Sequence, residues 1–236
     1  YTHIGPSTIF KKIILRLGAN IADKIVTASD NSFPFKMEKV TTIGHAISYK
    51  YFFRDAADVK SKDFLILSRI SIIKNIDESI QGFLNSSFGE TQSITIVGGP
   101  LTKEDEVYEN YLKDKYSQYP NIKFVGSIPH KELSSFIEEF GFHINNTALG
   151  SYDKSVLETM AAGIINFYTN SDYDKNIPSK YEKVLKYNGT IDDLTKKIHS
   201  VDELKNKELH EIITFSQNSV KNESLETIHE RITKVI

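Results

Sequence analysis

The stretch Gly150-Ser-Tyr-Asp-Lys-Ser-Val-Leu-Glu-Thr-Met-Ala-Ala-Gly163 directly follows an apolar run of strand length. This pattern predicts a loop that leads from a strand into a helix. The N-terminus of a helix carries unpaired N–H groups and a partial positive charge, so a diphosphate over residues 151–155 would meet donors already oriented toward it. Lys154 adds a full positive charge and Glu158 adds a carboxylate. The stretch therefore predicts a phosphate-facing site on an α/β fold.

Apolar runs of strand length alternate with helical patterns along most of the chain. The expected strands are 24–28, 40–43, 64–67, 93–97, 122–125, 142–145 and 164–168. Alternation of this kind is typical of a parallel sheet with crossover helices, and most of these runs are too apolar to have one solvated face. We therefore expect a Rossmann-like parallel sheet with flanking helices. From about residue 190 the chain becomes helical and polar, and we expect no site chemistry there.

Composition excludes several classes of protein. The chain has 236 residues, 39% of them hydrophobic, and a net charge of -2. Its charges are scattered, so nucleic acid is not an expected partner. The absence of Cys leaves no disulfide framework and no thiolate metal site, which fits a reducing cytoplasm. There is no apolar run of about 18 residues to span a membrane. Since the chain starts at Tyr1, we expect it to be part of a longer protein.

Polar side chains follow four of the expected strands. Because the carboxyl ends of parallel strands share one edge of a sheet, these clusters should converge on one crevice. Arg69 offers a planar fork and Lys74 a point charge, which together suit a diphosphate. An Arg and a Lys five residues apart also fit a solvated turn, but the convergence favours a site. The seven His residues show no close pairing of the metal-ligand kind; we expect His143 to be a core residue and His45 to belong to a structural turn.

Four blocks, taken in order, resemble the donor-binding half of glycosyltransferase family 4, enzymes of the GT-B fold. They are Ala22-Asp-Lys-Ile-Val-Thr-Ala-Ser29 with Val40-Thr-Thr-Ile-Gly-His45; Leu67-Ser-Arg69 with Lys74-Asn75; Ile96-Val-Gly98 with Phe124-Val-Gly-Ser-Ile-Pro129; and Val156-Leu-Glu-Thr-Met-Ala-Ala-Gly163. The resemblance covers residues 20–170. Each block is weakly specific alone, and the joint order and spacing make the match more specific.

The resemblance implies roles for several residues. Arg69 and Lys74 would hold the donor diphosphate and Glu158 would bind the ribose hydroxyls. The base would lie against Ser127, Ile128 and His130, largely through main chain. Gly150, Ser151, Tyr152, Asp153, Lys154 and Ser155 would contact sugar and phosphate. The expected ligand is a nucleotide sugar such as a UDP- or GDP-sugar, with no cofactor and no metal.

One position departs from the family pattern. The family signature has two Glu separated by seven residues, and this chain has Gly150 where the first should stand. Its contact to the donor sugar must be lost or supplied by another group such as Asp153. The alternative to an enzyme is a non-catalytic nucleotide-sugar-binding or interaction module with a decayed donor site. An NAD-dependent oxidoreductase is disfavoured, because no glycine fingerprint follows the strand at 64–67.

The resemblance also predicts how the chain is divided. Residues 1–47 would be the tail of an N-terminal acceptor domain, 48–62 a linker, 63–200 the nucleotide-sugar-binding domain and 201–236 C-terminal helices. The activity expected is transfer, retaining by analogy, to a glycan or lipid-linked acceptor held by the missing domain. No catalytic residue is expected within this chain, which should be inactive alone. By analogy we expect a cytoplasmic, bacterial protein of polysaccharide biosynthesis, associated peripherally with the inner face of the membrane.

Overall fold

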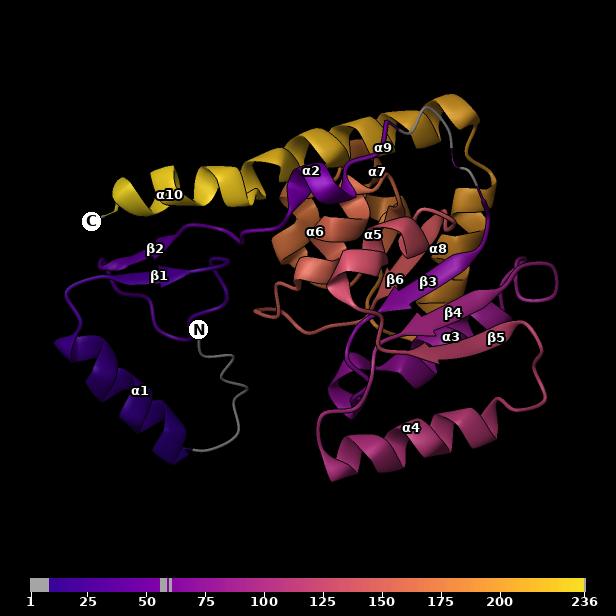
Figure 1. The fold of residues 1–236 in the computed structure, drawn as a ribbon, viewed down its shortest axis with the longest axis horizontal. Helices are drawn as coiled ribbons and strands as arrows, with labels where there is room; N and C mark the ends of the chain where they lie inside the picture. The colour runs from indigo at the N-terminus through magenta and orange to yellow at the C-terminus, as the bar shows by residue number, and fades with distance from the viewer. Residues whose placement is uncertain (1–8, 56–58, 60, 236) are drawn as a thin grey trace.

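The computed structural model describes residues 9–55, 59 and 61–235 (Figure 1). Its strands are β1 (Ile25–Thr27), β2 (Val40–Thr42), β3 (Phe64–Leu67), β4 (Ile94–Val97), β5 (Ile122–Gly126), β6 (Phe142–Asn145) and β7 (Ile165–Tyr168). Its α-helices are α1 (Ile9–Ile21), α2 (Tyr49–Phe52), α3 (Ile76–Leu84), α4 (Lys103–Lys115), α5 (His130–Ile137), α6 (Lys154–Ala161), α7 (Ser179–Leu185), α8 (Ile191–Asp202), α9 (Asn206–Val220) and α10 (Leu225–Thr233). Short 3-10 helices are η1 (Ile72–Lys74), η2 (Ser171–Asn176) and η3 (Lys221–Glu223).

Five of the strands form one parallel sheet in the order β5-β4-β3-β6-β7. The chain moves outward from β3 to β5 and then returns to place β6 on the other side of β3. Crossover connections are almost always right-handed, so this reversal puts successive helices on opposite faces of the sheet. The gap between the carboxyl ends of β3 and β6 is therefore the topological switch point, where sheets of this class bind ligands.

The sheet is buried on both faces. Every residue of β3, β4, β6 and β7 is buried, and the central strand β3 is a continuous apolar run, as burial on both faces favours. The polar His143 of β6 and Asn166 of β7 are register partners, and the His143 Nδ1 lies 2.7 Å from the Asn166 Oδ1. Phe64 stacks on Phe142 with ring centroids 5.0 Å apart. Helix α3 packs on α8, and α6 packs on α9. The expected α/β fold is confirmed, and each strand lies within one residue of its predicted bounds.

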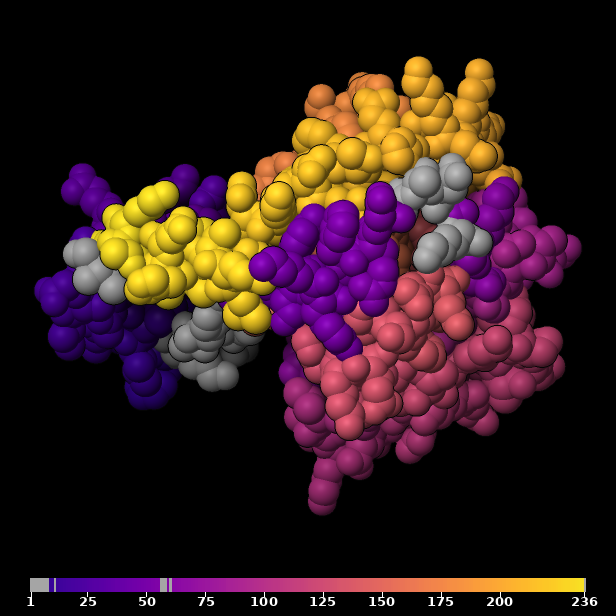
Figure 2. Space-filling model, turned by 45° about the horizontal axis from the view of Figure 1, so that its top comes forward, coloured from indigo at the N-terminus to yellow at the C-terminus, as the bar shows by residue number. Residues whose placement is uncertain are grey.

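The N-terminal elements lie beside the main sheet instead of extending it (Figure 1). β1 and β2 pair in parallel as a separate two-stranded sheet. The C-terminal helix α10 returns across them, as the yellow and indigo surfaces of Figure 2 show. Arg231 of α10 donates to the carbonyl oxygens of Ile43 and His45, the latter at 2.6 Å. The C-terminal helix is thus joined directly to the segment that follows β2.

The segment predicted as a linker, 48–62, contains the short helix α2. Phe52 at the end of this helix is fully buried, and α2 packs against α6. Burial of an aromatic side chain of this size stabilises the docked position by roughly 2 kcal/mol. The described part of this segment therefore includes a packed turn as well as connecting chain.

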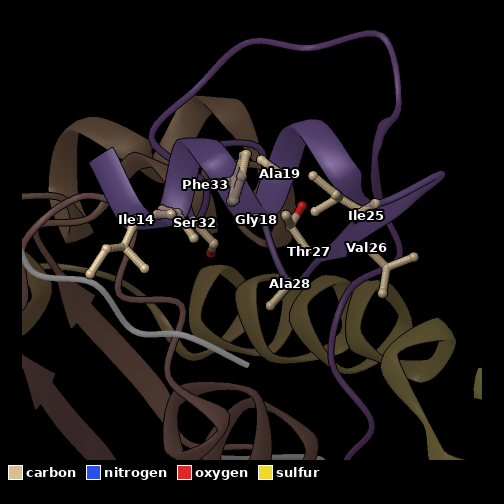
Figure 3. A pocket seen from close by; sticks show the side chains of 11 residues that line it. Ile14, Gly18, Ala19, Ile25, Val26, Thr27, Ala28, Ser32 and Phe33 are labelled. Atoms are coloured by element: carbon tan, nitrogen blue, oxygen red, sulfur yellow. The ribbon is translucent and has the colours of Figure 1, made fainter. Parts of the chain in front are cut away.

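Helix α1 exposes a row of large apolar side chains. Exposed fractions are 80% for Ile9, 70% for Phe10, 57% for Leu17 and 84% for Ile21. Between α1 and β1 lies a cavity of about 380 Å³ lined by apolar and small side chains, with no charged residue among them (Figure 3). A contiguous apolar surface of this kind usually marks a packing interface.

Candidate functional site

An ion pair spans the switch point of the sheet. Lys74 follows β3 in η1, and Asp153 precedes α6 after β6. The Lys74 Nζ donates to both carboxylate oxygens of Asp153, at 2.9 and 2.7 Å. The side chains are only 10% and 17% exposed. The structure thus places Lys74, the predicted diphosphate ligand, at the switch point of the sheet and next to a carboxylate.

The backbone around Lys74 is fixed by an unusual residue. Asn75 has φ 46° and ψ 44°, a left-handed conformation that is uncommon outside glycine. Its Nδ2 donates to the carbonyl oxygen of Asn146 at 3.1 Å, across the switch point. The amide therefore ties the chain leaving β3 to the chain leaving β6, and it holds the turn from which Lys74 projects.

The loop before α6 is held mainly through its backbone. The main-chain N–H of Asp153 donates to the Tyr173 Oη at 2.5 Å, and Asn170 Nδ2 donates to the carbonyl of Ser151 at 3.1 Å. The side chain of the N-cap residue, Asp153, makes no capping hydrogen bond to the first turn of α6. The first N–H groups of this helix are therefore not capped by Asp153 and could donate to an anion.

Two further cations lie on this edge of the sheet. Arg69 follows β3 and Lys154 begins α6; both are exposed. Within the described residues, neither forms an ion pair. Arg69, Lys154 and the start of α6 thus add positive charge to the edge of the sheet where Lys74 and Asp153 pair.

Glu158 lies in the middle of α6 and is 8% exposed. Burial raises the pKa of its carboxyl above the usual range, and His130 and Lys154 partly oppose this effect. The Nε2 of His130 is 3.5 Å from the Glu158 Oε1, and the imidazole stacks on Tyr51 with centroids 5.8 Å apart. The structure thus brings together Glu158 and His130, predicted ligands of ribose and base.

We expect Glu158→Gln to stabilise the protein at pH 8 more than at pH 4. Because the folded-state pKa is raised, ionisation of Glu158 opposes folding, and this cost disappears as pH falls through that pKa. Urea unfolding at both pH values measures the difference. Glu226→Gln is the control, for which we expect a change in stability of opposite sign. A hydrogen bond from its own backbone N–H lowers the pKa of Glu226, so this variant should lose stability mainly at high pH. If both variants changed the free energy of unfolding equally at the two pH values, the raised pKa of Glu158 would be contradicted.

The loop predicted to receive the base follows β5. Ser127 is exposed, while Ile128 is half-buried and packs against the core. A Cβ added at Gly99 would lie 2.8 Å from the Ser127 Oγ, so the loops after β4 and β5 approach closely. The side chain of Ile128 is thus packed against the core, and contact of its main chain with a base stays a prediction.

The backbone conformation and surroundings of residue 150 explain why it is a glycine. Its φ is +87°, and a Cβ there would lie 2.6 Å from the backbone oxygen of Asn31. The N-terminal segment is held in place because Ser29 Oγ and Asn31 Nδ2 donate to Asp172 at 2.8 and 2.6 Å. A glutamate at position 150 would therefore be strained and would displace the chain near Asn31.

The Tyr152 side chain points into the protein interior, although the residue belongs to the predicted sugar and phosphate loop. It is 1% exposed, and its hydroxyl donates to the Glu223 Oε1 at 3.1 Å. Burial, followed by the charge of Glu223, raises its pKa. Only the main chain of Tyr152 is left for a ligand. Of its predicted neighbours, Lys154 is exposed and Ser151 and Ser155 are half-buried.

Sequence reasoning missed Glu223, a buried acid in the C-terminal region. Its carboxylate accepts from Tyr152, from Lys175 at 3.1 Å and from the backbone N–H of His45, and it lies 3.9 Å from Arg231. It therefore joins the N-terminal segment, the loop before α6 and α10. The sequence gives only a weak indication that Glu223 is buried, because the residue stands in a polar helical stretch where acids usually face solvent.

The two internal histidines have structural roles, as predicted. His143 is fully buried, and burial lowers its pKa to about 4; its Nδ1 lies 2.7 Å from the Asn166 Oδ1. His45 is 3% exposed and stacks on Tyr152 with centroids 5.4 Å apart.

Within residues 9–55, 59 and 61–235, no group of three or more His, Cys, Asp or Glu side chains could hold a metal ion. None of the described helices combines the length and the apolar character needed to cross a membrane.

No family model matches the sequence, and no curated protein matches it. Solved glycosyltransferases match the structure. Anabaena HepE in complex with UDP-glucose has a TM-score of 0.79 and 13% identity, covering 94% of this chain and 66% of that one. Sucrose-phosphate synthase from Thermosynechococcus elongatus has a TM-score of 0.80 and 14% identity, covering 97% and 61%. S. aureus TarM has a TM-score of 0.73 and 16% identity, covering 99% and 48%.

At sequence identities of 13%, 14% and 16%, structural similarity to these proteins shows the fold alone. The five-stranded parallel sheet with flanking helices is that of GT-B glycosyltransferase domains, as the sequence predicted. The chain covers 65% of the length of HepE in complex with UDP and glucose.

Proposed function

We propose that this chain is the donor-binding part of a glycosyltransferase and binds a nucleotide-diphosphate sugar. The observation that carries the proposal is the position of Lys74, at the switch point between β3 and β6, where it pairs with Asp153 at the start of α6. Arg69 follows the same strand β3, and Lys154 begins α6. HepE, which has this fold, has been solved with UDP-glucose bound. Glu158 would then accept from the ribose hydroxyls, and the loop containing Ile128 would hold the base.

The chemistry of transfer fits these groups. When the bond between the sugar and the diphosphate breaks, negative charge grows on the leaving diphosphate. Arg69, Lys74 and the α6 N-terminus can stabilise that charge by fixed positive charges and N–H donors, without a metal ion. Transfer with retention of configuration, to a glycan or lipid-linked acceptor at the inner membrane face, is part of the proposal by analogy with the family that the sequence resembles.

The acceptor would be bound by a second domain, equivalent to the part of the solved glycosyltransferases that this chain does not cover. We propose that residues 1–47 belong to a second domain, whose remaining part packs on α1 and over the apolar cavity beside it. Exposure of Ile9 and Ile21, at 80% and 84%, supports this packing. A two-stranded sheet such as β1–β2 also has little stability of its own. On this basis the 236-residue chain alone should bind a donor weakly and transfer little.

A second candidate is a nucleotide-sugar-binding module without transfer activity. Gly150 favours it, because the loop lacks a side chain where the resembling family carries an acid. Transfer or hydrolysis of a bound sugar nucleotide by the full-length protein would distinguish the enzyme from the module.

Calorimetric titration with UDP, GDP and their sugars tests the donor site. We expect binding of one nucleotide family, and Arg69→Ala should weaken it at least about tenfold, since a hydrogen bond to a charged group contributes about 1.5–3 kcal/mol. Lys113→Ala, an exposed lysine of α4 paired with Glu109, is the control and should not change the affinity. Binding of no nucleotide, or equal affinity for the Arg69 variant, would contradict the proposal.

A further inference from the structure

The Lys74–Asp153 pair places a carboxylate where the proposed function needs an anionic ligand. The ammonium reaches both oxygens of Asp153, at 2.9 and 2.7 Å. With exposed fractions of 10% and 17%, the pair is shielded from water, unlike surface ion pairs that contribute little. An anion that approaches Lys74 must therefore displace Asp153 or share the ammonium with it.

The side chain of Asp153 has no essential role in holding α6. Although the residue precedes the first turn, its carboxylate makes no capping bond. The loop is fixed instead by the Asp153 N–H, which donates to Tyr173. The other contacts of the carboxylate are Asn145 Nδ2 at 3.2 Å and Ser151 Oγ at 3.4 Å. The carboxylate can consequently release Lys74 without unwinding the helix.

The charge of Asp153 affects two kinds of ligand differently. A diphosphate between Lys74 and the start of α6 would lie beside the carboxylate, and like charges at such a distance repel each other. A ligand with hydroxyl groups next to its diphosphate can donate to the displaced carboxylate and offset that repulsion. A ligand that ends in phosphate offers only further negative charge.

We propose that Asp153 is a specificity-determining residue of the donor site, an inference that rests on the proposed function. It makes the site select a diphosphate that carries hydroxyl donors, as a nucleoside diphosphate sugar does, over a free nucleoside diphosphate or inorganic pyrophosphate. Lys74 exchanges one anionic partner for another, and Asp153 contacts the sugar.

Calorimetry on the 236-residue chain and its Asp153→Asn variant tests this selection. The ligands are inorganic pyrophosphate, UDP with UDP-glucose, and GDP with GDP-mannose. Asn keeps the size of the side chain but removes the charge. We expect pyrophosphate and the bound nucleoside diphosphate to bind the variant about tenfold more tightly, and the sugar nucleotide to bind equally or less tightly.

Two further variants test whether the change in ligand preference depends on the charge of Asp153 and on its pairing with Lys74. Asp174→Asn removes the same charge from η2, where Asp174 pairs with Lys186 at 2.6 Å, and should leave the preference unchanged. Lys74→Met removes the ammonium but keeps an apolar stem, and in combination with Asp153→Asn it should abolish the gain for pyrophosphate. Thermal unfolding of each variant confirms that the fold is retained.

The outcomes separate two failures. If nucleotides bind but Asp153→Asn tightens all ligands equally, or none, the selection by Asp153 is overturned and the donor site stands. If no nucleotide binds either protein, the proposed function fails and the sugar selection fails with it, even where pyrophosphate still binds more tightly to the variant.

Discussion

Replacement of Glu223 by alanine is expected to lower the free energy of unfolding by about 3 kcal/mol. Glu223 is 6% exposed, and its carboxylate compensates Lys175 and Arg231 while accepting from the Tyr152 hydroxyl. Removal of the carboxylate leaves a buried hydroxyl without this partner. It also leaves the Arg231 guanidinium, at 20% exposure, without the acid that lies beside it among the described residues. The loss should appear in urea unfolding followed by circular dichroism.

Glu211→Ala is the matched control. Its pair with Lys180 has a shorter N–O distance, 2.7 Å, but the side chains are 59% and 46% exposed. Solvated pairs of this kind contribute little, so the stability should hardly change. If Glu211→Ala proved as destabilising as Glu223→Ala, burial would not be the cause, and the structural role of Glu223 would be contradicted.

The sequence was sufficient for the sheet and for part of the site. The strand at 64–67 is a short apolar run with polar residues after it, and burial on both faces makes such a run easy to recognise. Parallel strands end at one edge, so the position of Lys74 after one strand was enough to place it near the loop before Glu158, where it pairs with Asp153.

The contacts within the site could not be predicted in the same way. Lys74 and Asp153 are 79 residues apart, and their pairing depends on the order of β3 and β6 in the sheet. Tyr152 is buried, and its hydroxyl donates to Glu223, which lies 71 residues along the chain. A charged residue in a polar helical stretch usually faces solvent, so no local pattern distinguishes Glu223 from exposed acids nearby.

Gly98→Ala should lower the free energy of unfolding by about 3 kcal/mol or more, because two costs combine. Its φ of +138° strains any residue with a Cβ, by an order of 1–3 kcal/mol, and that Cβ would lie 1.8 Å from the backbone oxygen of Ser68. Ser68 cannot simply move away, since its N–H donates to Val97 and the next turn is held by Ile70 N–H to Gly99, both at 3.0 Å.

The comparison with Gly126→Ala isolates the second cost. Gly126 ends the neighbouring strand β5 with φ +73°, but a Cβ there would have no neighbour within 4 Å. Only the backbone strain applies, so we expect a loss of about 1 kcal/mol. Urea unfolding of both variants gives the difference directly. Gly98→Ala should also weaken nucleotide binding, because displacement of Ser68 shifts Arg69, the next residue. Equal losses of stability in the two variants would show that the approach of the β3 and β4 loops does not require glycine at position 98.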